Sequence, residues 1–420
     1  MNLLKTSVLN GVAVLVKTAT LFILNKILAI YVGPNGYAAI GQFQNFIQMV
    51  TTFAGSAINT AVIKYTAEYY DDENKQRKVW KTAGSIVLVS SLILSIIILI
   101  IKRQLSIAIF HTDIYQNIFI WFAGFLIFFT FNALFLAILN GKKEILKLVI
   151  ANIFGSIFSL VITSILAIKY SLYGALVALS IYQSLAFFVT LLICFKLNWF
   201  KISYLFGKLD KEISKSFLAF ALMALGSAIC VPLSQMAIRS YIIHQYGLTY
   251  AGYWEAMIRL SAAYLMLVTT TLGVYYLPRL SELKTLDSIK EEVYKGYKFI
   301  FPIAILAGFT VYVLRDSIIN LLFSKTFLPM RDLFCWQMLG DTLKIGSWIL
   351  AYLMLSKAMT KLFIITELVF AISSVALTYL FTQLVGFEGV SIAHMVNYGI
   401  YWIVMGFFVF RALKDREAKI

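Results

Sequence analysis

The chain has 420 residues, of which 61% are hydrophobic and 13% are charged, and its mean hydropathy is +0.85. These values exclude a soluble globular protein and predict a protein that crosses a membrane several times. Cys194, Cys230 and Cys335 lie far apart in apolar segments without a CxxC motif, so neither a disulfide framework nor a metal site is expected. No removable signal peptide is expected, because the first residues run into a helix without a small-residue cleavage site.

Hydrophobic runs of about twenty residues predict an all-α fold with twelve transmembrane helices. In chain order, the predicted spans are 9–32, 37–63, 82–101, 117–139, 148–168, 174–195, 217–243, 251–277, 299–322, 334–356, 362–384 and 389–410.

The distribution of basic residues predicts the orientation of these spans. With a cytoplasmic N-terminus, the even-numbered connections and both termini hold most of the 36 Lys and Arg residues. The odd-numbered connections then hold only Lys102, Arg103, Lys169, Lys325 and Arg331. By the positive-inside rule, both termini are expected to be cytoplasmic. The same asymmetry accounts for most of the net charge of +16, so nucleic acid is not expected as a partner.

A long basic connection near the middle of the chain, 196–215, predicts two lobes. Residues 1–205 would form an N-terminal lobe with the first six spans, and residues 206–420 a C-terminal lobe with the last six. A weak internal repeat supports this division, because Lys26 precedes Tyr37 by the same spacing with which Arg239 precedes Tyr250. Such similarity is typical of parallel repeats related by an axis along the membrane normal.

The second span carries a ribbon of polar residues. At about 100° per residue, six of them fall within roughly 60° of Asn45. They are Gly41, Asn45, Gln48, Thr52, Ser56 and Asn59. Lipid cannot satisfy amides and hydroxyls, so this face must meet other helices or water. We interpret it as the wall of an aqueous cavity, with helix–helix contact through small and polar residues as the alternative.

Cations within the predicted spans are a second sign of a cavity, because each costs a few kcal/mol unless it is paired or hydrated. Lys17 lies on the polar face of the first span and is expected to line the cavity. Lys26 lies on the opposite face, where it either lines the cavity or extends towards the interface. Arg239 is its counterpart in the second lobe. Arg259 follows Glu255 by four residues, so a local ion pair is the alternative to a binding role.

The tenth span places Gln337, Asp341, Lys344, Trp348 and Tyr352 on one face. Aromatic rings that stack on sugars, beside polar groups that bind hydroxyls, predict a surface for a sugar chain. Mutual neutralisation of Asp341 and Lys344 is the alternative.

Buried carboxylates are candidates for proton coupling, because desolvation raises the pKa of a carboxyl group and a nearby cation lowers it. Asp341 is the first candidate, with Lys344 expected to leave it when substrate binds, and Glu255 and Glu367 follow. A lone histidine in the last span, His394, is expected to be structural.

Four segments resemble the Wzx-type flippases of Gram-negative bacteria, which move O-antigen or enterobacterial common antigen (lipid III) units linked to undecaprenyl pyrophosphate. They are KILAIYVGPNGYAAIGQF, AGSAINTAVIKYTAEYYDD, YYLPRLSEL and MRDLFCWQMLGDTLKIGSWILAYLMLSKA. The resemblance covers essentially the whole chain, and the last segment is its most specific part.

This family is the polysaccharide transporter family of the multidrug/oligosaccharidyl-lipid/polysaccharide (MOP) superfamily. The resemblance implies two six-helix lobes around a central basic cavity, alternating access and an inner-membrane location. By position, the family's basic cavity residues correspond to Lys17, Lys26, Arg239 and Lys344, whereas Arg259 is a candidate from its helical face alone.

The leading hypothesis is therefore a flippase that carries undecaprenyl-pyrophosphate-linked oligosaccharide for lipopolysaccharide biosynthesis. A multidrug cation/proton antiporter of the same fold is the runner-up, but it would need an acidic pocket. A membrane polysaccharide polymerase or ligase would need a large extracytoplasmic segment, which the short outward connections do not provide. No cofactor is expected, and the absence of a Walker-type loop favours coupling to a proton gradient over ATP. Membrane lipids, a polysaccharide polymerase and a chain-length regulator are candidate partners.

Overall fold

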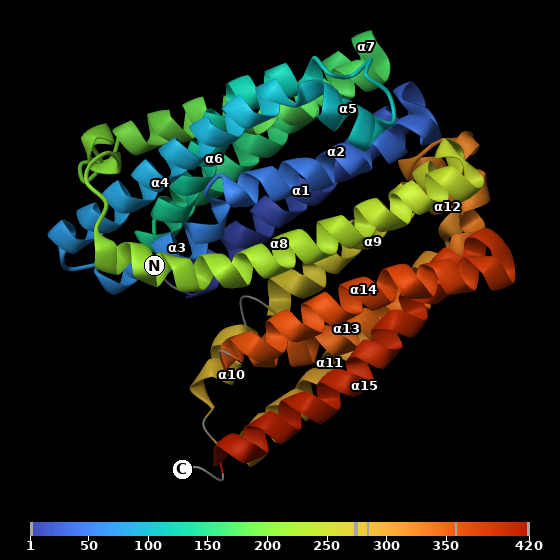
Figure 1. Ribbon diagram of the computed structural model, residues 1–420. Helices are drawn as coiled ribbons and strands as arrows, with labels where there is room; N and C mark the ends of the chain where they lie inside the picture. Colours follow the sequence, from blue (N-terminus) through green and yellow to red (C-terminus); the bar gives the residue numbers. More distant parts are fainter. Residues whose placement is uncertain (1–2, 273–275, 284, 358, 418–420) are drawn as a thin grey trace. The chain divides into compact units, whose positions relative to one another are not determined.

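The computed structural model describes residues 3–272, 276–283, 285–357 and 359–417, and these residues form helices and turns without any β-strand (Figure 1). They divide into two compact units, Met1–Pro232 and Leu233–Ile420, and the boundary lies inside a single helix, α8 (Lys211–Tyr246). The predicted lobes divide earlier, after residue 205, and this assignment stays a prediction.

Unit 1 is a bundle in which α6 packs against α4 and α7, and α1 packs against α7. Proline at the first turn helps to start α2, and the Asp72 carboxylate caps α4 by accepting from the Lys75 N–H at 3.0 Å. Its helices are α1 (Leu3–Tyr31), α2 (Gly33–Phe53), α3 (Asn59–Glu68), α4 (Glu73–Ile100), α5 (Lys102–Phe110), α6 (Ile118–Gly141), α7 (Ile145–Phe195) and the first part of α8, with 3₁₀ segments η1 (Ser56–Ile58) and η2 (Ile202–Leu205).

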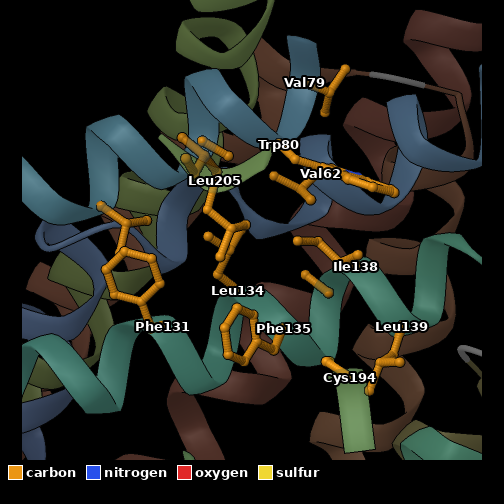
Figure 2. Close-up of a cluster of buried hydrophobic side chains, with 14 of the residues drawn as sticks. Val62, Val79, Trp80, Phe131, Leu134, Phe135, Ile138, Leu139, Cys194 and Leu205 are labelled. Atoms are coloured by element: carbon orange, nitrogen blue, oxygen red, sulfur yellow. The ribbon is translucent and has the colours of Figure 1, made fainter. Parts of the chain in front are cut away.

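A buried cluster holds α3, α4, α6 and η2 together (Figure 2). Trp80 lies in this cluster beside Leu134, Ile138 and Leu205, and its indole N–H donates to Thr66 Oγ1 at 3.0 Å. Burial of large apolar side chains holds α6 against α3 and α4, while the indole hydrogen bond joins α4 to α3.

Unit 2 is built around α13, which packs against α11 and α15, while α14 packs against α15. A tight turn at Gly247, with φ of +91°, joins the end of α8 to α9 and turns the chain back on itself. Its remaining elements are α9 (Leu248–Thr271), α10 (Leu277–Glu282), α11 (Leu286–Val313), α12 (Arg315–Leu322), η4 (Lys325–Leu333), α13 (Phe334–Ser356), α14 (Thr360–Val385), η5 (Gly386–Glu388) and α15 (Gly389–Glu417).

The helices confirm an all-α membrane protein that crosses the bilayer several times. In the described residues, seven helices are long and apolar enough to span a membrane, or eight if the bent pair α2 and α3 is one span. Among these, the 51-residue α7 leaves helical geometry at Tyr170 and Ser171, and the segment Thr360–Lys414 contains both α14 and α15. The halves of α7 correspond to the predicted spans 148–168 and 174–195. Helices α8 and α9, with 36 and 24 residues, are also long enough, so the helices are consistent with the twelve predicted spans.

The straight helix assumed for the second span is wrong, because α2 and the segment Ser56–Glu68 meet at an angle of 64°. Gly55 lies at the bend with φ of +139°, a conformation that favours glycine. The Ala54 carbonyl beside it accepts a hydrogen bond from Ser90 Oγ at 2.7 Å. The predicted polar ribbon is therefore interrupted, since Ser56 and Asn59 follow a different helix axis from Asn45.

Candidate functional site

Asp341 on α13 lies at the centre of a hydrogen-bonded cluster inside unit 2 and is only 1% exposed. Its Oδ2 accepts from Ser261 Oγ and from the Tyr264 hydroxyl, each at 2.5 Å. Its Oδ1 accepts from Gln337 Nε2 at 3.3 Å and lies 2.9 Å from His394 Nε2. Four polar partners on three helices therefore surround this carboxylate, which is the usual requirement for burying a charge.

Lys344, one turn further along α13, does not pair with Asp341. Its Nζ lies over the ring of Trp348, 5.3 Å from the centroid, and over that of Tyr398, 4.9 Å from the centroid. Within the described part of the chain, no ion pair joins this ammonium to a carboxylate. The mutual neutralisation allowed by the sequence is thus not formed, because groups from α9 and α15 satisfy Asp341 while aromatic rings hold Lys344.

A second charged cluster joins α8 and α9. Arg239 Nη2 lies 2.5 Å from Glu255 Oε2, and Arg259 Nε lies 2.8 Å from Glu255 Oε1. Arg239 is 1% exposed, and its guanidinium lies 5.3 Å from the centre of the Trp254 ring. The i,i+4 pair of the sequence is present, and Arg239 joins it from the preceding helix. Both guanidinium groups therefore bind a carboxylate, which leaves them less free for an anionic ligand than Lys344.

The remaining predicted residues of unit 2 take more peripheral positions. Trp348 is half-buried under Lys344, and Glu367 is half-buried on α14. The Tyr352 hydroxyl donates to the Thr269 carbonyl at 3.2 Å, so this ring links α13 to α9.

In unit 1, Lys17 is exposed on α1 and Lys26 is half-buried. Asn45 and Thr52 are buried, Asn59 is half-buried and Gln48 is exposed. The Asn45 Nδ2 group is buried without a hydrogen-bond partner among the described residues.

Gln48 borders a hollow of about 260 Å³ in unit 1, formed by α2, α6 and the second half of α7. Its lining residues are Gln44, Ile47, Gln48, Thr51, Phe129, Leu179, Tyr182 and Gln183. The polar lining residues of α2, Gln44, Gln48 and Thr51, are spaced i, i+4 and i+7, and their face is rotated by roughly a quarter turn from the face centred on Asn45.

Sequence reasoning missed several members of these clusters. Ser261 and Tyr264 share a face of α9, but nothing in their spacing connects them to Asp341. His394, expected to be structural, lies directly against Asp341. Gln44 and Thr51 could have been found by testing each possible face of the second span, whereas Tyr182 and Gln183 lie in a mostly apolar segment without a polar face that would have drawn attention to them.

Comparison of the chain with known proteins identifies its family. The family model described as "Polysaccharide biosynthesis protein" matches residues 3–284. The chain is 30% identical over 407 residues to the Lipid III flippase of Escherichia coli (strain K12), a match that covers 96% of this chain and 97% of that protein. The chain belongs to the polysaccharide biosynthesis protein family. The chain matches the Lipid III flippase of Shigella flexneri with the same identity and coverage.

Solved structures show the same fold at lower identity. An inward-facing multidrug resistance MATE family transporter of the MOP superfamily matches with a TM-score of 0.77 and 16% identity, over 95% of this chain and 96% of that one. The lipid II flippase MurJ, in an inward closed conformation, matches with a TM-score of 0.72 and 17% identity, over 97% of this chain and 87% of that one. The resemblance predicted from the sequence is thus confirmed, and this polysaccharide biosynthesis protein has the fold of these transporters.

Proposed function

We propose that the protein is a flippase that moves undecaprenyl-pyrophosphate-linked oligosaccharide from the cytoplasmic to the periplasmic leaflet of the bacterial inner membrane. Similarity to two proteins named as lipid III flippases, over nearly the full length of each, supports this function. It also favours transport over an enzymatic activity. The polar clusters lie on helices that are apolar elsewhere, as expected for a headgroup that crosses while its polyprenyl tail stays in lipid.

The environment of the Lys344 ammonium group is the structural observation that best supports the proposal. A pyrophosphate loses its hydration on entering a low-dielectric layer, and a cation with three hydrogen-bond donors can replace part of that water. The Lys344 ammonium lies over Trp348 and Tyr398, and no ion pair commits it to a carboxylate in the described residues. Ring faces make an intramembrane cation tolerable until a stronger anionic partner arrives.

The same geometry disfavours a multidrug cation antiporter. An extruded cation needs an available carboxylate, but Glu255 binds two guanidinium groups and Asp341 accepts bonds from neighbouring side chains. The MATE transporters share the fold at 16% identity, which carries no information on substrate.

Energy coupling through Asp341 is part of the proposal, in a revised form. Lys344 makes no ion pair with Asp341, so the group that exchanges a proton is the Asp341–His394 pair. Tyr264 is the other titratable residue in contact with Asp341, and Lys344 lies nearby on the same helix. In proteoliposomes, an inward proton gradient should accelerate flipping by the intact protein but not by Asp341→Asn. An equal response of this variant would transfer the coupling role to Glu255 or Glu367.

The orientation is likewise proposed, with both termini in the cytoplasm and the predicted lobes alternating access to the two sides. Reporters fused at Lys75 or Lys208 should be cytoplasmic, and reporters at Thr112 or Leu248 periplasmic. A periplasmic reporter signal at the C-terminus would contradict twelve spans.

Export of surface polysaccharide in a strain that lacks its own copy of the gene tests the role of Lys344. Lys344→Ala should reduce export about tenfold or more, because a hydrogen bond to a charged group contributes about 1.5–3 kcal/mol. Lys344→Arg should retain most export, since the positive charge remains. Lys361→Ala, at an exposed lysine on α14, is the matched control. Full export by Lys344→Ala at normal membrane levels would remove Lys344 from the site.

A further inference from the structure

The hollow in unit 1 has a character unlike that of the clusters in unit 2. It measures about 260 Å³, and each residue that lines it is uncharged. Such a wall does not suit a pyrophosphate, which needs cations or several converging donors. We propose that this hollow is a sugar subsite, which holds one neutral pyranose ring of the lipid-linked oligosaccharide. The inference rests on the proposed flippase function and assigns the sugar and the pyrophosphate to different groups of residues.

The polar residues that line the hollow offer both donors and acceptors. The Gln48 amide is exposed and makes no hydrogen bond in the described part of the chain, so its NH₂ and its oxygen are both available. Gln183 Nε2 donates to the Tyr182 hydroxyl at 3.0 Å, which leaves the Gln183 oxygen as an acceptor and the Tyr182 proton as a donor. Sugar hydroxyl and acetamido groups donate and accept in the same mixed pattern.

The hollow is also lined by apolar residues. Phe129, on α6, is buried, and Leu179 and Ile47 contribute aliphatic side chains to the lining. A pyranose ring has the same two characters, because its C–H groups form an apolar face and its hydroxyls project from the edge. Aromatic and aliphatic contact with one face, combined with a few placed polar groups, is the usual composition of a small-molecule site.

The size of the hollow suits a single sugar ring. At about 30 Å³ for each water molecule, 260 Å³ corresponds to roughly nine waters. This space is large enough for one sugar ring. The subsite would therefore read a single sugar, while the rest of the oligosaccharide lies outside it.

Thr51 offers the hollow an acceptor rather than a donor. Its hydroxyl donates to the Ile47 carbonyl at 2.8 Å, inside its own helix, so only its lone pairs face a ligand. The chain bends shortly after this turn, at Gly55, and the bend keeps α3 off the axis of α2.

Equilibrium binding to the full-length protein in lipid nanodiscs tests the assignment. Two fluorescent probes are compared: a polyprenyl pyrophosphate that carries one N-acetylhexosamine, and the same polyprenyl pyrophosphate without sugar. Gln48→Leu and Tyr182→Phe should each weaken binding of the sugar-bearing probe about fivefold, the effect of one lost hydrogen bond, and leave the sugarless probe unchanged. Gln104→Leu, at an exposed glutamine on α5, is the matched control and should change neither affinity.

Each remaining outcome of this experiment overturns a different statement. If both probes bind the intact protein but Gln48→Leu and Tyr182→Phe weaken them equally, or weaken neither, the sugar subsite is wrong and the flippase function stands. If the intact protein binds neither probe, the proposed function fails and the subsite fails with it. Normal elution of the variants on size exclusion guards against loss of fold.

Discussion

Replacing Glu255 by glutamine is expected to be the most damaging single change in the cluster of Arg239, Glu255 and Arg259. Glu255 is 3% exposed and accepts from both guanidinium groups. The substitution keeps the size of the side chain but removes the negative charge that pairs with Arg239, which is itself 1% exposed. A buried guanidinium without a counter-charge cannot lose its proton to escape the penalty.

The expected cost follows from the geometry of the pair. At 2.5 Å and an effective dielectric constant of about 20, attraction between Arg239 and Glu255 amounts to ~7 kcal/mol before desolvation is subtracted. Removing one partner of a buried pair costs about 3–5 kcal/mol. Arg259→Met should cost less, because its side chain is 14% exposed and Glu255 keeps Arg239. The double variant Arg239→Met/Glu255→Gln should recover part of the loss, since the uncompensated charge is gone.

Thermal stability is measured by heating the detergent-purified protein and then running size-exclusion chromatography. The quantity compared is the temperature at which half of the protein still elutes as a single species. Glu255→Gln should lower this temperature by several degrees, with Arg259→Met between it and the unmodified protein. If Glu255→Gln is as stable as the unmodified protein, or the double variant is less stable than Glu255→Gln, then the cluster does not stabilise unit 2 in the way argued.

Two further predictions concern unit 1. Gly55→Ala should destabilise the protein by about 1–3 kcal/mol, because φ of +139° is strained for alanine and the new Cβ would lie 2.5 Å from Val87 Cγ2. The companion change Val87→Ala should restore only part of the thermal stability, since it removes the overlap but not the strain; full restoration would contradict the conformational argument. Burial lowers the pKa of Lys142 below its usual 10.5, an effect that Glu73 and Glu144 partly offset. The unfolded chain therefore binds this proton more tightly, and stability should increase as the pH rises through the lowered pKa towards 10.5. Lys142→Met should lose this increment and the exposed control Lys78→Met should keep it; an unchanged pH profile in Lys142→Met would exclude Lys142 as the source.

The helices were largely predictable because a bilayer requires about twenty apolar residues for each crossing. The interruption of α7 at Tyr170 and Ser171 lies between two predicted spans, where Lys169 and Tyr170 reduce the hydropathy. The bend at Gly55 was not predictable in the same way. Gly41 is also a glycine, but α2 continues through it. The bend at Gly55 lies against Val87 and Ser90 of α4, and these long-range contacts cannot be read from the local sequence.

The partners of buried polar groups were less accessible to sequence reasoning. Helical periodicity identified Gln337, Asp341 and Lys344 as one face, but it cannot rank local pairs against distant ones. Ser261 and His394 reach Asp341 from positions 80 and 53 residues away, and this contact removes the expected role of Lys344 as counter-ion. The polar face of α2 was placed about a quarter turn from the hollow, because Asn45 was taken as its centre although it is buried.

Flipping by the purified protein in liposomes tests the central claim most directly. The vesicles contain a fluorescent polyprenyl-pyrophosphate-linked oligosaccharide, and a membrane-impermeant quencher reports which leaflet holds it. Vesicles with the intact protein should exchange the probe between leaflets much faster than protein-free vesicles, and Lys344→Ala should reduce this rate about tenfold or more. Exchange no faster than in protein-free vesicles, with the protein folded and inserted, would contradict the assignment as a flippase.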